Sequence, residues 1–430
     1  MTSFAIGLTG LGTMLVMLFL RQPVWLALAI IGIVGNYILN GTFGAQYVAG
    51  TTFFDEASNY NLAVIPLFIL MGEVASQSRM SAELFGAART VLSGIRGGLA
   101  MATIAASGAF GALCGSSVAT AASMTRIAMP EMKNAGYDRG YASGSVAAGG
   151  SLGILIPPSI ILVIYGSVTE TSVAQLFAAS MIPGIALLGL YLIVAAIVAG
   201  KSAPTESSAT LRERLAALKK PWQFVLLFIL TIGGIYAGVF SPNEAASVGA
   251  GGAIALGFFQ RSLTLDGLQK SIQSSVLVSS ALLMIIIGAK MFANFIVQTR
   301  LPDHLLDLAQ AADLSVWIVM GLIVAIYLVL GCFLEGIGMV LITVPVFLPV
   351  VAGYGFDPIW FGVLVAVLVE LGLITPPVGM NLFIIRAQVP DLPMKAIYQG
   401  VIPFLIAPVI LVGLLFVAPN IALWLPGLLY

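Results

Sequence analysis

Two pairs of consecutive prolines stand inside otherwise apolar segments. Pro157 and Pro158 belong to GGSLGILIPPSI, and Pro376 and Pro377 belong to ELGLITPPVG. Proline lacks an amide hydrogen and disfavours helical geometry in the residue before it, so a helix cannot run normally through either pair. In a membrane, the carbonyl oxygens freed in this way need protein, water or a bound ion as a partner. Oxygen ligands suit a hard cation, so the chemistry indicated is the binding of sodium.

The two proline pairs are parts of an internal repeat with an offset of 219 residues. Without a gap, the offset carries Pro130 onto Pro349, Asp138 onto Asp357 and Gly153 onto Gly372. The chain is therefore divided into a first repeat (residues 1–200), a linker (residues 201–221) and a second repeat (residues 222–430). Interrupted apolar segments at corresponding positions of two halves are typical of the binding site of a secondary transporter.

Two stretches ahead of the proline pairs, residues 97–132 and 315–351, have small or polar residues in the middle: FGALCGSSVAT and LGCFLEGIGMV. Each is only about 36 residues long, which leaves little room for two full membrane crossings and a turn. We therefore expect two re-entrant hairpins, with an ordinary pair of spans as the alternative. The helices broken by the prolines are expected at residues 141–168 and 358–385.

The tips of the predicted hairpins supply glycines and hydroxyl side chains that could add ligands. These residues are Gly115, Ser116, Ser117 and Thr120 in the first hairpin, and Gly336, Gly338 and Thr343 in the second. Any one of them alone is better explained by close packing of helices. The duplicated set favours a binding site, because the helix N-termini there attract anionic groups and the C-terminal carbonyls attract cations.

Glu335 and Glu370 are carboxylates at the expected depth of the membrane, where such groups are costly and are commonly functional. The offset pairs them with Ser116 and Ser151, so that only the second half carries the acids. A position at a wet helix end explains them equally well. Arg126 is a basic counterpart that could bind a substrate carboxylate or form a structural salt bridge.

The composition defines the class of protein. Of 430 residues, 60% are hydrophobic and 8% are charged, whereas a soluble domain carries roughly a quarter charged residues. We expect an all-α polytopic membrane protein with about ten transmembrane helices besides the two hairpins. The crossings are expected at residues 4–20, 24–40, 61–78, 141–168, 173–200, 222–240, 245–260, 272–297, 358–385 and 397–418.

The linker at residues 201–220 is rich in basic residues, so the positive-inside rule predicts that it is cytoplasmic. With ten crossings, both termini then lie outside and the two repeats are inverted. The 18 basic and 18 acidic residues balance, so nothing indicates binding to nucleic acid.

Enzymatic activity is poorly supported. The GGSLG sequence fits the G-x-S-x-G pattern but lacks its strand–turn–helix context, and the sole histidine, His304, lies in a distant segment. Gly200, Lys201 and Ser202 look like the end of a phosphate-binding loop, yet Ala195 stands where that motif requires glycine. We therefore expect no enzyme and no cofactor, with sodium as the coupling ion and the only metal.

Five motifs together resemble the large membrane (DctM-like) subunit of tripartite ATP-independent periplasmic (TRAP) transporters. They are FGALCGSSVAT, PEMKNAGYD, GGSLGILIPPSI, the LF and PG of LFAASMIPG, and ELGLITPPVGMNLF. The resemblance implies an elevator-type, sodium-driven importer of an organic acid in the bilayer of a bacterial inner membrane. It further implies two partners, namely a separate small four-helix membrane subunit and a periplasmic substrate-binding protein.

The resemblance also implies roles for individual residues. Sodium would be bound by Gly115, Ser116, Ser117, Gly153, Ile156 and Pro157 in the first half, and by Gly336, Gly338, Thr375 and Pro376 in the second. The substrate-binding candidates are Thr120, Arg126, Ser159, Glu335 and Asn381. A self-sufficient sodium-coupled organic anion symporter is the main alternative, and a non-transporting membrane scaffold or an intramembrane enzyme is a weaker one.

Overall fold

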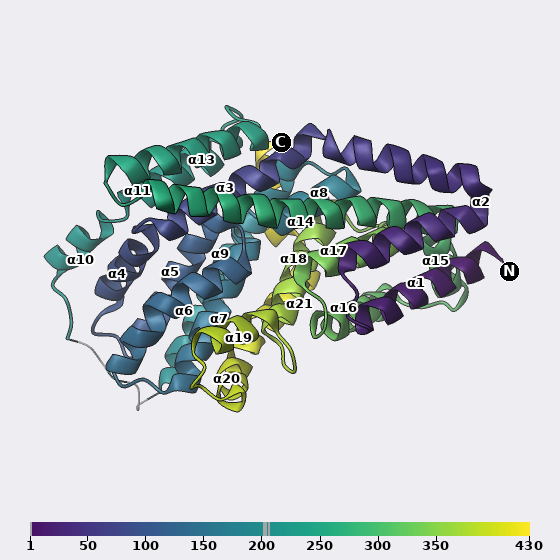
Figure 1. Cartoon of the computed structure of the whole chain (residues 1–430). Coiled ribbons are helices and arrows are strands. Elements are labelled where there is room, and N and C mark those ends of the chain that lie inside the picture. Colours follow the sequence, from purple (N-terminus) through teal and green to yellow (C-terminus); the bar gives the residue numbers. More distant parts are fainter. Residues whose placement is uncertain (1, 201–203, 205–206) are drawn as a thin grey trace.

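The computed structural model describes residues 2–200, 204 and 207–430, and every regular element in that part of the chain is a helix (Figure 1). Seven helical stretches are long and apolar enough to cross a membrane, or eight if a bent pair counts as one span. The seven are Val24–Ala57, Tyr60–Gln77, Arg139–Thr169, Val173–Ala199, Leu265–Gln298, Gly336–Gly353 and Met394–Val417. The other predicted crossings fall on the bent pair or on shorter or less apolar helices, such as α1 (Ser3–Phe19) and α13 (Pro242–Phe259).

The internal offset of the sequence reappears in the helix boundaries. The first half contains α5 (Gly98–Cys114), α6 (Ser117–Asn134), α7 (Arg139–Leu155) and α8 (Ile160–Thr169). The second half contains α16 (Val316–Gly331), α17 (Gly336–Gly353), α18 (Pro358–Ile374) and α19 (Met380–Gln388). A shift of 219 residues carries the bounds of α6 and α7 onto those of α17 and α18. Asp138 and Asp357, which the same offset relates, are the N-caps of α7 and α18.

Both proline pairs interrupt their helices. α7 ends at Leu155 and α8 begins at Ile160, while α18 ends at Ile374 and α19 begins at Met380. The peptide bond between the two prolines is cis in each break. Gly379, just before α19, has a φ of +60°, so the chain cannot continue as a helix across the second break.

Glycines let the first helix of each hairpin lie directly against the broken helix. A Cβ atom on Gly111 of α5 would stand 2.5 Å from the Cα atom of Gly153, and a Cβ atom on Gly331 of α16 would stand 2.7 Å from the Cα atom of Gly372. The backbone atoms of the neighbouring helix cannot move aside as a flexible side chain can. Only glycine therefore fits where these helices cross.

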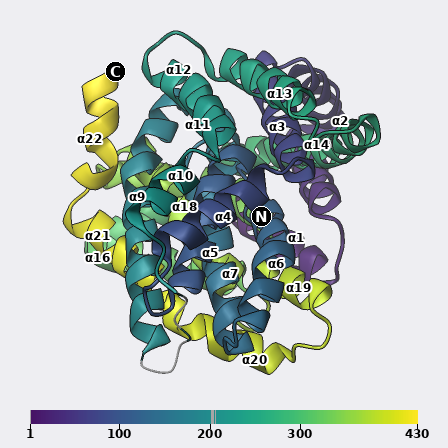
Figure 2. The same ribbon diagram turned by 90° about the vertical axis from the view of Figure 1, so that its left-hand side faces the viewer.

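A second group of helices runs beside the hairpins and broken helices. α14 (Leu265–Gln298) lies along α2 (Val24–Ala57) and α3 (Val64–Gln77), and α13 lies along α3. Figure 2 shows these four helices together at the upper right, with α5, α6, α7 and α19 below them. α9 (Val173–Ala199), α21 (Ile406–Val417) and α22 (Asn420–Leu429) pack against α18.

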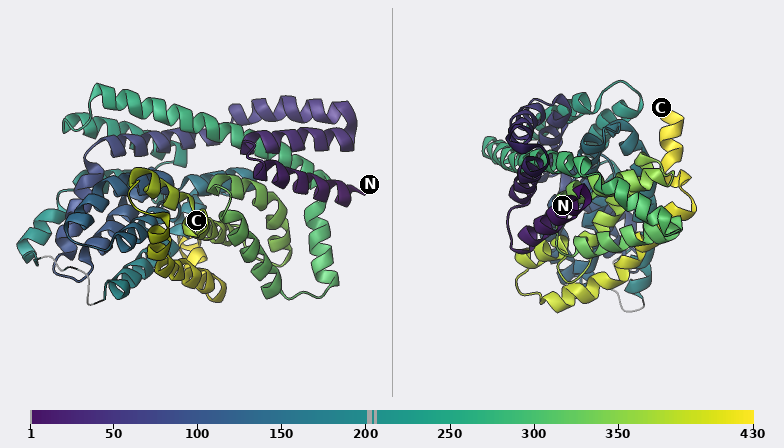
Figure 3. Two further views of the ribbon diagram at one scale, coloured as in Figure 1. Left: turned by 60° about the horizontal axis from the view of Figure 1, so that its bottom comes forward. Right: turned by 90° about the vertical axis from the view of Figure 1, so that its right-hand side faces the viewer.

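Several helices differ from the predicted segments. The crossing expected at residues 24–40 is followed by more helix as far as Ala57, and Gly41 (φ 68°, ψ −163°) breaks the two parts from each other. Figure 3 shows the two parts side by side with α1. α4 (Met80–Leu92), α15 (Leu301–Ala311), α20 (Met394–Val401) and α22 were not predicted as helices of their own, nor was α10 (Leu211–Leu218) in the linker. Residues 201–203 and 205–206 of the predicted linker lie outside the described residues.

Candidate functional site

A cavity of about 330 Å³ lies between the two hairpin tips and the two broken helices. The tips contribute Gly115, Ser116 and Ser117 from one side, and Glu335 and Gly336 from the other. The broken helices contribute Ile154, Ile160, Ile161, Leu373 and Met380. α3 and α14 complete the wall with residues that include Gly72, Glu73 and Leu282. The elements that the sequence singled out from each half therefore meet around one space.

The first hairpin tip touches the first helix break through its backbone. Gly115 adopts a φ of +61°, and its carbonyl accepts a hydrogen bond from the amide of Ile160 (3.3 Å). Ser116 is the N-cap of α6 and accepts from the amide of Ala119 (3.3 Å). A Cβ atom on Gly153 would lie 3.0 Å from the Oγ1 atom of Thr120. Gly115, Ser116, Thr120 and Gly153 are thus neighbours.

The ends of the first break are also defined. Ile156 follows the last residue of α7 and donates its amide to Leu152, as a C-cap does, and Pro157 comes next. Ser159 is the N-cap of α8, and its hydroxyl accepts from the amide of Leu162 (3.3 Å). Both Ile156 and Ser159 are buried, and neither lines the cavity.

The second hairpin tip has a carboxylate where the first has a hydroxyl. Glu335 is the N-cap of α17, and its Oε1 atom accepts from the amide of Gly338 (3.3 Å), just as Ser116 serves α6. A carboxylate is favoured at this end of a helix by the free amides and the helix dipole. Glu335 therefore has a capping role and also faces the cavity. Its role in binding an ion or a substrate stays a prediction.

The second break contains the remaining sodium candidates. The hydroxyl of Thr375 donates to the carbonyl of Leu371, and the carbonyl of Pro376 lies 3.6 Å from the thiol of Cys332 on the hairpin. No described donor is hydrogen-bonded to the carbonyl of Thr375. That oxygen is one of the free carbonyls that the proline pair was expected to create.

Asn381 connects the two halves at the cavity. Its Nδ2 atom donates to the hydroxyl of Ser117 (2.6 Å), and both side chains are buried. The Oδ1 atom of Asn381 is buried as well and accepts no hydrogen bond from the described residues. An unpartnered amide oxygen beside a serine hydroxyl is a ready pair of oxygen ligands.

Glu370 faces the first half. Its side chain is fully buried, and neither carboxylate oxygen has a hydrogen-bond partner of normal geometry among the described residues. The Leu155 backbone and the hydroxyl of Tyr191 are close to it, and that hydroxyl lies 3.0 Å from the hydroxyl of Ser151. The offset partners Ser151 and Glu370 therefore lie next to the same tyrosine.

The structure does not bring every candidate to the cavity. Arg126, proposed as a substrate ligand, lies farther along α6 and lines two other cavities. Of the substrate candidates only Glu335 lines the space between the tips; Thr120, Ser159 and Asn381 are buried beside it. Glu73 on α3, which does line it, was missed. A lone acid inside the apolar segment at residues 61–78 was the signal that could have revealed it.

Two hairpins, two broken helices and a cavity between them define a membrane transporter. The chain belongs to the family described as "Tripartite ATP-independent periplasmic transporter, DctM component", whose model matches residues 11–421. It is a multi-pass membrane protein and a large permease component of this family.

Relatives in bacteria support the assignment over nearly the whole chain. The chain is 36% identical to the C4-dicarboxylate TRAP transporter large permease DctM of Pseudomonas aeruginosa, covering 87% of this chain and 88% of the relative. It is 31% identical to the sialic acid TRAP transporter large permease SiaM of Vibrio cholerae, covering 96% of each. It is 30% identical to the ectoine TRAP transporter large permease TeaC of Halomonas elongata, covering 97% and 98%.

A solved structure has a similar fold. The YdaH transporter of Alcanivorax borkumensis superimposes with a TM-score of 0.60, at 13% sequence identity, covering 96% of this chain and 98% of that one. At this identity the likeness concerns the fold alone.

Proposed function

We propose that the chain is the large permease subunit of a sodium-driven importer of an organic acid, with the substrate delivered by a periplasmic binding protein. The observation that carries the proposal is one cavity lined by both tips and both broken helices. The unpartnered oxygen of Asn381, whose amide is hydrogen-bonded to the lining residue Ser117, and the free carbonyl of Thr375 in the second break supply further oxygens. The relatives are named for C4-dicarboxylates, sialic acid and ectoine, all of which bear a carboxylate. A carboxylate-bearing substrate is therefore part of the proposal.

The charges around the cavity give a reason for coupling to sodium. Glu73 and Glu335 line the cavity, and none of its described lining residues is a lysine or an arginine. A substrate carboxylate entering alone would meet charges of its own sign, and in a site of low dielectric that repulsion is costly. Sodium ions bound by oxygens at the tips would offset it. Substrate binding would then require that sodium bind first.

The two groups of helices suggest how the substrate crosses the membrane. The hairpins and broken helices would move as one body against α2, α3, α13 and α14, which is an elevator mechanism. α3 and α14 form one wall of the cavity, so such a movement would open and close it. A small four-helix membrane subunit would be the partner of the static group.

Reconstitution tests the proposal. Liposomes containing this chain, its small subunit and its binding protein should accumulate succinate, used as the first probe, when an inward sodium gradient is imposed. Ser116→Ala and Ser117→Ala should raise the sodium concentration needed for half-maximal uptake by several-fold. Ser247→Ala on α13, whose hydroxyl donates to the Asn243 carbonyl, is the matched control and should leave it unchanged.

Two outcomes would overturn the assignment. An unchanged sodium dependence in both tip variants would remove the sodium site from the first hairpin. Robust uptake by this chain alone, without either partner, would favour the self-sufficient symporter over the permease subunit.

A further inference from the structure

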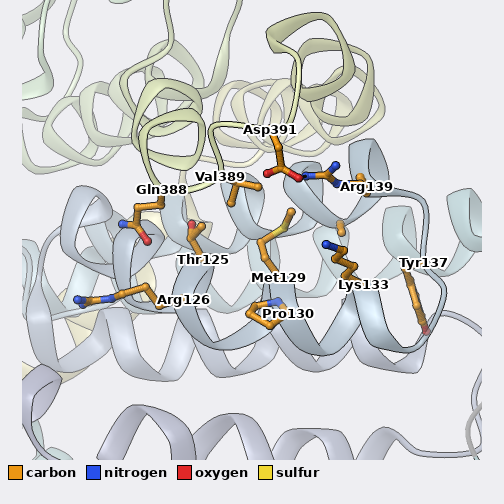
Figure 4. A pocket seen from close by; sticks show the side chains of 11 residues that line it. Thr125, Arg126, Met129, Pro130, Lys133, Tyr137, Arg139, Gln388, Val389 and Asp391 are labelled. Atoms are coloured by element: carbon orange, nitrogen blue, oxygen red, sulfur yellow. Dashed lines mark hydrogen bonds and ion pairs between the residues drawn. The ribbon is translucent and has the colours of Figure 1, made fainter.

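A second cavity, of about 610 Å³, lies near the end of α6 that is remote from the hairpin tip (Figure 4). It is lined by α6, by the start of α7, and by the end of α19 with the segment that follows it. Its charged lining residues are Arg126, Lys133, Arg139 and Asp391. Thr125, Tyr137 and Gln388 add further polar groups. Three positive charges and one negative charge leave a net charge of +2 on the wall.

Two of the three positive charges, Arg126 and Lys133, lie on α6. Met129, Pro130 and Lys133 lie three, four and seven residues after Arg126, so the four residues share one face of the helix. Seven residues correspond to about 10 Å along a helix. Figure 4 shows Arg126 at one end of the cavity, beneath Gln388, and Lys133 and Arg139 at the other. The cavity therefore presents cationic groups at both of its ends.

Only one of the three cations is neutralised. Arg139 forms an ion pair with Asp391 (2.7 Å). Arg126 and Lys133 form no ion pair or hydrogen bond with any described residue. The Arg139 hydrogen bond holds the pKa of Asp391 below its usual value, and the charge of Lys133 acts in the same direction. Lys133 is thus close to the Arg139–Asp391 pair, and the cationic character of the cavity exceeds what that pair can balance.

The second cavity and the hairpin cavity both border α6, at different levels of the helix. Arg126 also borders a smaller space of about 220 Å³ between α3 and α6, with Ser76, Gln77 and Ser123. The hydroxyls of Ser76 and Ser123 lie 2.9 Å apart and bridge these two helices. Ala122, the preceding residue of α6, lines the hairpin cavity. Residues of α6 therefore border three successive spaces, from the tip to Lys133.

We propose that the cavity between Arg126 and Lys133 is a binding site for small organic dianions, where a substrate released from the hairpin cavity is held before it leaves. The direction of travel rests on the proposed function, whereas the binding of a dianion does not. Two separated, uncompensated cations suit two carboxylates on one small molecule. The walls belong to three separate elements, and Arg126 and Lys133 are exposed, so the site is an open cleft that a small molecule can enter from water.

Cysteine modification measures the occupancy of this site in the full-length chain. Gln388→Cys would be introduced with Cys114→Ala and Cys332→Ala, and the protein placed in phosphatidylcholine nanodiscs. The anionic reagent methanethiosulfonate ethylsulfonate should react faster than the neutral methyl methanethiosulfonate, after correction for their rates on a free thiol. Succinate should slow both reactions at this position, and acetate should do so much less.

Removing the two free cations should abolish the effect. Arg126→Gln/Lys133→Gln should remove the preference for the anionic reagent and weaken protection by succinate at least about fivefold, which corresponds to modest, partly screened ion pairs. Arg261→Gln/Lys270→Gln, which removes two exposed cations elsewhere, is the matched control and should change neither. Circular dichroism and gel filtration verify that each variant is folded.

Three results would overturn the proposal: no protection by succinate, equal protection in Arg126→Gln/Lys133→Gln, or protection produced by phosphatidylglycerol nanodiscs without succinate. The last result would assign the site to a lipid headgroup. Because this readout needs no transport, it is independent of the sodium-driven uptake assay. Failure of the dianion site and failure of the proposed function can therefore be told apart.

Discussion

The amide of Asn381 donates a 2.6 Å hydrogen bond to the hydroxyl of Ser117, and this contact joins the first hairpin to the second broken helix. Each residue lies where its own half of the chain was expected to bind ions or substrate. Their contact means that the two halves do not form two separate sites. A substitution or a bound ion at the first hairpin tip therefore acts directly on the break in the other half, through this contact.

This contact should appear as an energetic coupling. Ser117→Ala and Asn381→Ala should each lower the thermal stability of the purified protein, and the double variant should be more stable than the sum predicts by about 1 kcal/mol. Ser117→Ala combined with Ser247→Ala should be additive, because the two serines share no partner. Additivity of the Ser117 and Asn381 changes would show that the hydrogen bond contributes nothing.

The close approach of α16 to α18 gives a second prediction, on the stability of the fold. Gly331→Ala should destabilise the protein by about 1–3 kcal/mol, since the added methyl group meets the Gly372 backbone and the helices must move apart. Gly321→Ala on the same helix meets nothing within 4 Å and should be neutral or stabilising by up to about 1 kcal/mol. Thermal unfolding of both variants in detergent is the measurement. Equal stabilities would mean that the crossing tolerates a side chain.

The third prediction tests the function of the break between α18 and α19. Pro376→Ala/Pro377→Ala should allow α18 and α19 to join, which would pair the free Thr375 carbonyl and remove an oxygen that an ion could use. The protein should be no less stable, yet it should not transport. Sodium-driven uptake and thermal unfolding measured on one preparation test both parts. If uptake is retained, the break has no role in transport and is only a kink that serves helix packing.

The Arg139–Asp391 pair should regulate the charge of the second cavity. Asp391→Asn leaves Arg139 unpaired, so the anionic reagent should modify Gln388→Cys faster and succinate should protect it at lower concentration. Because Arg139 lowers the pKa of Asp391, the stabilising effect of the pair is complete above the usual aspartate pKa and is lost as the pH falls through the lowered value. The acid-induced unfolding of Asp391→Asn should therefore depend less on pH in that range. An unchanged modification rate would contradict this role.

The orientation in the membrane is tested by labelling. A cysteine replacing Ser207 should be protected from an impermeant maleimide in intact cells, whereas one replacing Asp313 should be labelled, because basic segments stay inside. Both positions are exposed, so access does not differ for structural reasons. Labelling at position 207 from outside would show that the chain has the opposite orientation in the membrane.

Local sequence effects explain what could be predicted. Proline has a definite effect on a helix, so the breaks before Ile160 and Met380 lie where the sequence indicated. Glycine and serine at the tips mark the turn at Gly115 and the N-cap at Ser116, and the offset transfers the N-cap position to Glu335. Each of these features depends on a few residues that are neighbours in the sequence, so it can be recognised from the sequence alone.

Features that depend on packing between distant segments could not be predicted. Arg126 lines the second cavity, whose other walls come from α7 and the end of α19, and a sequence alone does not state that these elements pack against α6. The burial of Glu370 against α7 depends likewise on the other half of the chain. α4 and α15 are short and amphipathic, so a search for apolar stretches passes over them.

The distance in sequence between Ser117 and Asn381, 264 residues, sets an order of events during biosynthesis. When the ribosome has completed the first hairpin, the helix that contains Asn381, the hydrogen-bond partner of Ser117, has not yet been made. The nascent chain must therefore hold a polar, unfinished tip in or beside the membrane until nearly its last helices emerge. Truncations that remove Asn381 should consequently leave the first half exposed to quality-control proteases, although every residue of that half is present.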